Sequence, residues 1–215
     1  MYARLLLAFG PQHWWSADSA FEVMVGAILT QSTRWHNVLR ALDRVRSSGM
    51  LSVRALATTR LSAIQRLLRS SGYFRQKARR VQVFSRWFLA TYRGRPSRMF
   101  ATKLKILREE LLSIWGIGPE TADTILLYAG NQPVFVVDAY ARRVFQRHQL
   151  IDGREPYSTV RHLVMHALPR RANLFNEFHA LLVAVGKQYC HRRNPDCAHC
   201  PLGTFPRQLE GTSNG

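Results

Sequence analysis

A single aspartate, Asp138, stands where a short apolar run meets the start of a predicted helix. Residues 134–137 read Val-Phe-Val-Val, and Ala-Tyr-Ala-Arg-Arg-Val follows the aspartate. Aspartate favours the N-cap position because its side chain accepts a hydrogen bond from a free N–H of the first helical turn. That position keeps the carboxylate ionised. An ionised carboxylate can stabilise developing positive charge or deprotonate water, so Asp138 is our candidate catalytic residue.

A glycine-rich hairpin precedes this aspartate in the chain. Gly116 and Gly118 flank Ile117, so the backbone can turn sharply at little steric cost. Pro119 suits the first position of the helix that we expect to follow. Free N–H groups at such a turn point outward and can hold a phosphate. We therefore expect residues 110–130 to form a helix-hairpin-helix that grips a DNA backbone.

The overall charge agrees with a nucleic-acid partner. The 215-residue chain has 31 basic and 13 acidic residues, a net charge of +18 and a pI of about 11.2. This excess points to a polyanion. Because 27 of the basic residues are arginine, an arginine-rich, GC-biased proteome is an alternative source of part of it. No apolar run approaches the roughly 20 residues that span a bilayer, and residues 5–9 are too short for a signal peptide.

The elements that must position these residues are predicted to be helices. Apolar residues recur at helical spacing, and no stretch alternates with a two-residue period for long enough to indicate a sheet. The fold class is therefore predicted as all-α. Expected helices cover residues 1–11, 21–29, 34–46, 61–71, 78–91, 103–113, 121–129, 139–149, 158–168 and 175–189, with a short helix within 47–58 and a loop at 92–97.

These motifs together resemble the endonuclease III, or HhH-GPD, superfamily of DNA glycosylases. The matching positions are Ile114, Gly116, Ile117, Gly118, Thr121, Ala122, Val137, Asp138, Ala141, Arg143 and Val144. The resemblance covers about residues 14–201. It implies a two-lobed helical fold: a six-helix domain over 22–132, and a second domain of 1–21 plus 133–215 with Asp138 and a cysteine-rich loop at 190–206. Residues 210–215 are expected to be disordered.

The same resemblance implies the partner and the setting. We expect a monomeric base excision repair enzyme that acts on double-stranded DNA containing a damaged base, with Gly116, Ile117, Gly118 and Thr121 as DNA-binding residues. It would be cytoplasmic, at the bacterial nucleoid, with no membrane association. Residues 71–81 resemble the family's second DNA-facing turn, where Arg75 and Lys77 would supply charge to phosphate; a solvated basic face is the alternative interpretation.

One departure from the family bears on mechanism. Bifunctional members carry a lysine directly before the Thr-Ala of the hairpin, and here that position is Glu120. A carboxylate cannot form a Schiff base. The lysines of this chain, at positions 77, 103, 105 and 187, all lie outside the hairpin. We therefore predict a monofunctional glycosylase in which Asp138 stabilises an oxocarbenium-like state and water is the nucleophile.

A narrower resemblance concerns the substrate. Trp14-Trp15, Ala-Ile-Leu-Thr-Gln-Ser-Thr at 27–33 and Trp35 are similar to the endonuclease-III-like 3-methyladenine DNA glycosylases, although Ser16 replaces a proline. This implies that Trp15 and Trp35, beside Trp14, sandwich the extruded base, while Gln31 fills the hole left in the duplex. N-alkylated purines are cationic and stack well between indoles. Simple packing of Trp35 on its helix is the alternative.

The three cysteines, Cys190, Cys197 and Cys200, are clustered, which in a cytosolic protein suggests metal. Their spacing matches three positions of the family's C-x6-C-x2-C-x5-C loop for a [4Fe–4S] cluster, but the fourth position is Pro206. Three outcomes are open: a cluster with another ligand such as His191, His199 or water; zinc on three cysteines and a histidine; or no metal. Residues His162, His166 and His179 are interpreted as packing or surface histidines.

Two further functions stay open at this point. One is an endonuclease III-like glycosylase for oxidised or mismatched pyrimidines, with weak AP-lyase activity through another amine. The other is a non-catalytic helix-hairpin-helix DNA-binding protein. Asp138 argues against the second, because phosphate binding does not need a carboxylate that faces the DNA.

Overall fold

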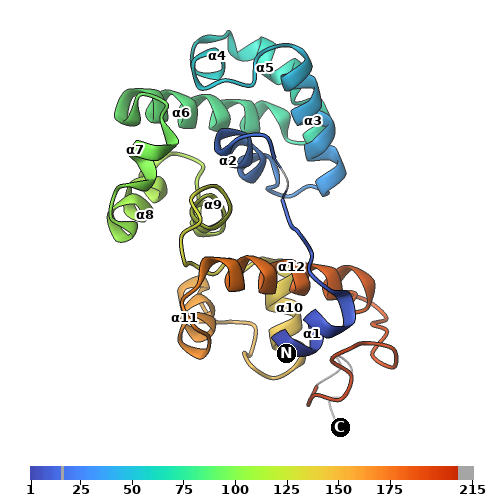
Figure 1. Ribbon diagram of the computed structural model, residues 1–215. Helices are drawn as coiled ribbons and strands as arrows, with labels where there is room; N and C mark the ends of the chain where they lie inside the picture. The colour runs from blue at the N-terminus through green and yellow to red at the C-terminus, as the bar shows by residue number, and fades with distance from the viewer. Residues whose placement is uncertain (16, 208–215) are drawn as a thin grey trace. The chain divides into compact units, whose positions relative to one another are not determined.

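Two compact units make up the structure, a computed structural model that describes residues 1–15 and 17–207. Unit 1 combines Met1–Trp14 with the chain from Pro133 onward, and unit 2 is Trp15–Gln132. All secondary structure in the described ranges is helical, which confirms the predicted all-α class (Figure 1). Ser16 and the tail predicted to be disordered lie outside the described residues. The predicted domain limits of 22–132 and 1–21 plus 133–215 stay predictions.

Unit 2 is organised around two helices, one buried and one long. Its elements are α2 (Ala20–Leu29), α3 (Trp35–Ser47), α4 (Val53–Thr58), α5 (Leu61–Leu67), η1 (Arg69–Ser71), α6 (Phe74–Tyr92), α7 (Pro96–Phe100), α8 (Leu104–Ser113), α9 (Pro119–Thr124) and η2 (Ile125–Ala129). The apolar α2 packs against α3, α6, α9 and η2, and all but its first residue are buried. The amphipathic α6 supports α4 and α5.

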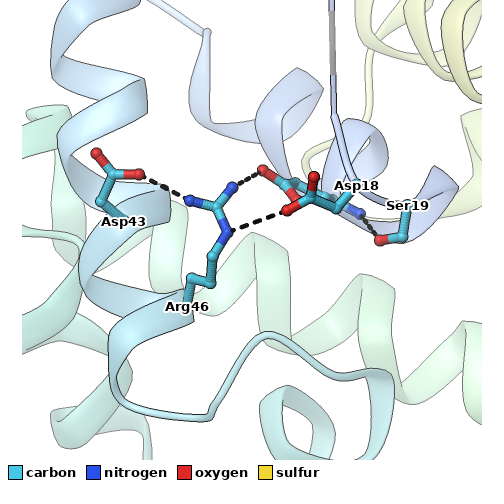
Figure 2. A network of polar contacts seen from close by, with 5 residues as sticks. Asp18, Ser19, Asp43 and Arg46 are labelled. Atoms are coloured by element: carbon cyan, nitrogen blue, oxygen red, sulfur yellow. Dashed lines mark hydrogen bonds and ion pairs between the residues drawn. The ribbon is translucent and has the colours of Figure 1, made fainter.

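A polar network fixes the start of α2 to the end of α3 (Figure 2). The Ser19 hydroxyl accepts a hydrogen bond from the backbone N–H of Glu22, which caps α2. Arg46, in the last turn of α3, pairs with Glu22 and with Asp18 and Asp43. Glu22 is buried, so its pairing with Arg46 offsets the cost of removing the carboxylate from water.

Unit 1 is built around α12 (Ala172–Gln188), which packs against α1 (Tyr2–Phe9) and α10 (Ala139–Arg147). The other helix in the described part of this unit is α11 (Tyr157–Ala167). Aromatic rings fill the core: Phe135 contacts Phe145, Phe175 and Phe178 at centroid distances near 6 Å. The buried run at 134–137 thus ends at Asp138 with its side chains held in this core.

Three local details differ from the sequence-based expectation. Helix α6 begins at Phe74 rather than at residue 78, because Tyr73 adopts a left-handed conformation (φ 44°) that sets the helix start directly after it. Helix α7 occupies part of the expected 92–97 loop, with Pro96 at its first turn, where proline's missing N–H costs nothing. The expected helix at 121–129 is α9 followed by a π-helical turn, η2.

Candidate active site

Asp138 caps helix α10, as the sequence predicts. Its Oδ1 accepts a hydrogen bond of 2.7 Å from the backbone N–H of Ala141. The side chain is 16% exposed, so it is mostly buried yet still reachable from solvent. Burial by itself would raise the pKa of Asp138, but His179 and the N–H groups of Ala141 and Tyr140 favour the carboxylate and bring the pKa below its usual 3.8. The group is therefore an anion at neutral pH.

His179 is a residue of this site that sequence reasoning missed. Its Nε2 lies 3.7 Å from Oδ2 of Asp138, and the imidazole is buried. The sequence alone favours a packing or surface histidine, because the spacing of His179 shows only that it lies on a helix, here α12. The packing of α12 against α10 brings it to the aspartate. No local signal in the sequence indicates this pair.

The helix-hairpin-helix is present between α8 and α9, which confirms that part of the fold. Gly116 has a φ of 86°, a conformation that favours glycine, and Gly118 is the N-cap of α9. An added Cβ at Gly116 would lie 2.5 Å from Cγ of Arg80, so a side chain there would force the Arg80 side chain to move. Arg108 of α8 forms a two-pronged ion pair with the buried Asp123 of α9, at 2.7 and 3.1 Å, which fixes the two helices to each other.

Gln31 is hydrogen-bonded to the hairpin, which lies in the same unit. Its Nε2 donates to the carbonyl oxygen of Gly116 (3.1 Å) and to Oγ1 of the buried Thr121 (2.8 Å), and its Oε1 accepts from Arg80. The predicted duplex-filling role of Gln31 would require these bonds to break. The side chains of Thr121 and Ile117 are buried, so these two residues can offer DNA only backbone groups.

The predicted pocket aromatics Trp15 and Trp35 do lie together. Their ring centroids are 4.9 Å apart with planes at 69°, and Trp15 also contacts Tyr128 of η2 at 5.2 Å and 37°. All three side chains are half-buried. Tyr128 is an addition that the sequence did not indicate. Trp14 belongs to unit 1, where the Lys187 ammonium lies 5.2 Å from its ring.

Lys77 requires a correction. Its side chain is 1% exposed, and Nζ donates to the backbone oxygens of Leu29 (2.8 Å) and Ser71 (2.5 Å). Burial, followed by the nearby Arg80, lowers the pKa of Lys77 to about 8. The ammonium therefore ties the end of α2 to η1 and does not reach phosphate. Arg75, in contrast, is exposed in the first turn of α6.

The cysteine loop holds itself together by protein contacts. Cys190 is buried; its Sγ accepts a hydrogen bond from Arg147 (3.0 Å), and its backbone oxygen accepts one from Arg143 (2.6 Å). Cys197 and Cys200 line a cavity of about 470 Å³ that is also lined by α1 residues and by Arg207. Burial raises the pKa of the Cys200 thiol, and the neighbouring Cys190 and Cys197 add to the rise.

This arrangement does not fit a four-thiolate iron–sulfur cluster. Residue 206 is proline, and its backbone oxygen contacts His148 Nδ1 at 2.9 Å. The imidazole of His199, a possible substitute ligand, lies 2.9 Å from Asp196. Within residues 1–15 and 17–207, no three His, Cys, Asp or Glu side chains are grouped to hold a metal ion. The loop thus carries three cysteine thiols, one fewer than a four-thiolate cluster needs.

The sequence matches the HhH-GPD superfamily of base excision DNA repair proteins over residues 25–170. The chain belongs to this superfamily. A protein of Methanocaldococcus jannaschii with the provisional name DNA repair glycosylase is 38% identical to this HhH-GPD protein, over 95% of this chain and 93% of its own. Endonuclease III of Thermotoga maritima is 29% identical, over 85% and 80% of the two chains.

Solved structures agree with this assignment. The H. pylori 3-methyladenine DNA glycosylase bound to 1,N6-ethenoadenine has a TM-score of 0.73 and 28% identity, and the match covers 86% of this chain and 93% of that one. An endonuclease III–DNA complex has a TM-score of 0.82 at 21% identity, which shows the shared HhH-GPD fold. The prediction of a DNA glycosylase of base excision repair is thereby confirmed. No helix in the described ranges combines the length and apolarity needed to cross a membrane.

Proposed function

We propose that this HhH-GPD enzyme is a monofunctional DNA glycosylase that removes alkylated purines from double-stranded DNA. The observation that carries the proposal is the half-buried cluster of Trp15, Trp35 and Tyr128. An N-alkylated purine is a cation with a flat ring, and electron-rich aromatic faces attract such rings more strongly than neutral ones. The likeness to a 3-methyladenine DNA glycosylase supports the same substrate class.

Asp138 is the proposed catalytic residue. Departure of the base leaves positive charge on the sugar, and a nearby carboxylate stabilises that charge. The same group can orient and deprotonate the water that attacks C1′. The lowered pKa of Asp138 keeps it ionised for both tasks at neutral pH.

The absence of strand cleavage follows from Glu120. It occupies the hairpin position at which bifunctional relatives carry the amine that forms a Schiff base, and a carboxylate cannot replace that amine. Lys77 is buried against two carbonyl oxygens, so it is also unsuited to attack a sugar. The reaction therefore stops at an abasic site.

DNA contact is assigned to the hairpin and to the turn before α6. The Ile117 N–H donates to the Ile114 oxygen within the turn, so the backbone N–H groups of Gly116 and Gly118 are the ones assigned to phosphate, and exposed Arg75 supplies charge. Trp115 at the hairpin is 49% exposed, with the Arg79 guanidinium 4.6 Å from its ring centroid, which adds a basic and aromatic surface beside it. We also infer that the cysteine loop needs no cluster, because Arg143 and Arg147 hold Cys190 directly.

The test scores base release and strand nicking separately on duplexes with 3-methyladenine, 7-methylguanine, thymine glycol or a G·T mismatch. We expect alkylpurine release, with nicking only after alkali and no borohydride trapping. Trp35→Leu should reduce release of the alkylpurine, whereas Trp87→Leu is the matched control, because Trp87 packs instead on Phe84 and Tyr92. Preferential release of thymine glycol, or nicking without alkali, would favour the endonuclease III-like alternative and contradict this proposal.

A further inference from the structure

Trp15 contacts both other rings of the aromatic cluster, and two residues pack closely against it. The first is Gly26 in the middle of α2: a Cβ built there would lie 2.9 Å from Cζ2 of Trp15 and 3.7 Å from Leu42. The second is Tyr128, whose ring is tilted by 37° at a centroid distance of 5.2 Å. The indole therefore rests directly on the backbone of a buried helix.

Gly26 and Tyr128 both stand at positions that an ordinary α-helix would not favour: a glycine within a helix and a π-helical turn. Glycine within a helix is unfavourable relative to alanine, and such a glycine usually has a packing or functional reason. Here the reason is the close approach of Trp15, because a rigid ring cannot yield to an added methyl group as a flexible chain end would. Tyr128 lies on the π-helical turn η2 (Ile125–Ala129), and π-turns within helices are frequent at functional sites.

The relative orientation of the Trp15 and Trp35 rings shows whether a base could stack between them. A base sandwiched between Trp15 and Trp35 would need nearly parallel rings about 7 Å apart, because each stacked contact takes about 3.5 Å. The observed rings are 4.9 Å apart at 69°, so the sandwich is closed in this state. Because Trp15 is packed against Gly26 and Tyr128, Trp35 is the ring that would have to move for a base to enter.

We propose that Gly26 and Tyr128 are positioning residues that seat Trp15 as the fixed stacking surface for an alkylated purine. This inference rests on the proposed function and names the residues that determine the enzyme's specificity for alkylated purines. By holding the Trp15 indole in place, Tyr128 maintains the stacking surface whose attraction for a cation favours charged N-alkylpurines over neutral purines such as hypoxanthine.

A double-mutant cycle tests the role of Gly26. Gly26→Ala should lower kcat/KM for 3-methyladenine release by roughly 10- to 100-fold, because small misplacements of binding groups have effects of this size. It should also alter the near-UV circular dichroism of the indoles. In a Trp15→Phe background the same change should have little further effect, because the smaller ring leaves room for the methyl group. An equal loss in both backgrounds, or none in either, would overturn the seating of Trp15 by Gly26.

Tyr128 provides a second measurement that does not depend on how Gly26→Ala folds. Tyr128→Leu should lower the ratio of 3-methyladenine to hypoxanthine release, while Tyr128→Phe keeps the ring and should preserve the ratio. Equal ratios in all three proteins would refute the role of Tyr128. If the wild-type enzyme releases no alkylpurine at all, the proposed function itself fails; if wild type is active and the variants match it, only this inference fails.

Discussion

Replacing Asp138 by asparagine should separate its catalytic role from its structural one. The side chain caps α10 through a 2.7 Å hydrogen bond from Ala141 N–H to Oδ1, and asparagine offers an oxygen at the same place. Asp138→Asn should therefore keep the cap and lose only the contribution of the charge, so it should lower the melting temperature less than Asp138→Ala does. Asp138→Ala removes the cap, at a cost of about 1 kcal/mol. In a protein of this size, that corresponds to a fall in melting temperature of about 2–4 °C.

Catalytic activity should depend on the negative charge of Asp138 and not on its hydrogen bond that caps α10. Loss of one group that stabilises transition-state charge costs about 2.7–4 kcal/mol, or about 10²- to 10³-fold in rate. Both Asp138 variants should show this loss in single-turnover base release from a 3-methyladenine duplex, scored after alkali. The reasoning is refuted if Asp138→Asn retains activity within tenfold of wild type, or if its melting temperature falls as far as that of Asp138→Ala.

The pH dependence of stability has a definite sign at this residue. The folded-state pKa of Asp138 lies below its usual 3.8. Its ionised form therefore stabilises the folded protein above that usual value, and this contribution is lost as the pH falls through the lower folded-state pKa. Between about pH 5 and 8 the carboxylate stays charged, so Asp138 should impose no pH dependence on base release there. The difference in unfolding free energy between wild type and Asp138→Asn should shrink as the pH falls below that usual value, because the Asp138 carboxylate is then protonated.

Four further predictions concern other residues of the chain. His179→Gln should raise the pKa of Asp138, because His179 makes the largest contribution that lowers it. The acid limb of the pH–rate profile should therefore shift to higher pH. The free-energy cost of burying the Lys77 charge should disappear as the pH rises from about 8 to 10.5, so the free energy of unfolding measured in urea should rise by about 3 kcal/mol over that range. Lys77→Met should lack this rise. If its free energy of unfolding changed with pH as that of the wild type does, the prediction would be contradicted. Metal chelators should leave both melting temperature and base release unchanged; a visible absorption band that chelation removes would argue for a cluster. Glu120→Lys should introduce an amine into the hairpin and yield borohydride-trapped DNA complexes, whereas Glu120→Gln should yield none.

The sequence was informative wherever local pattern determines structure. Helical spacing of apolar residues predicted most helices, and the hairpin glycines and the N-cap at Asp138 were recognisable because backbone conformation restricts residue type at such positions. Charge was less informative. Lys77 looked like a surface cation, yet two carbonyl oxygens accept its hydrogen bonds inside unit 2. A basic residue can be buried when such partners exist, and a sequence does not show distant partners.

The residues that were missed act through contacts between distant segments. Tyr128 meets Trp15 because η2 packs against α2, and its π-helical winding leaves no mark in the apolar spacing. His179 meets Asp138 only because α12 packs on α10. Gln31 was recognised by resemblance, but its bonds to Gly116, Thr121 and Arg80 depend on how the hairpin lies against α6. Each of these contacts is set by tertiary packing.

The division of the chain also determines the order in which the units can form during synthesis. Unit 2 is one uninterrupted stretch, so all of its helices can pack as soon as they leave the ribosome. Unit 1 is not: α1 packs on α12, and Gln12 bonds to Glu177, which lies 165 positions later. At about 5–20 residues per second, α1 waits roughly 10 to 30 seconds for its partner. During that interval α12 is not yet present to pack against α1, so the apolar face of α1 that includes Leu5, fully buried in the folded protein, stays uncovered.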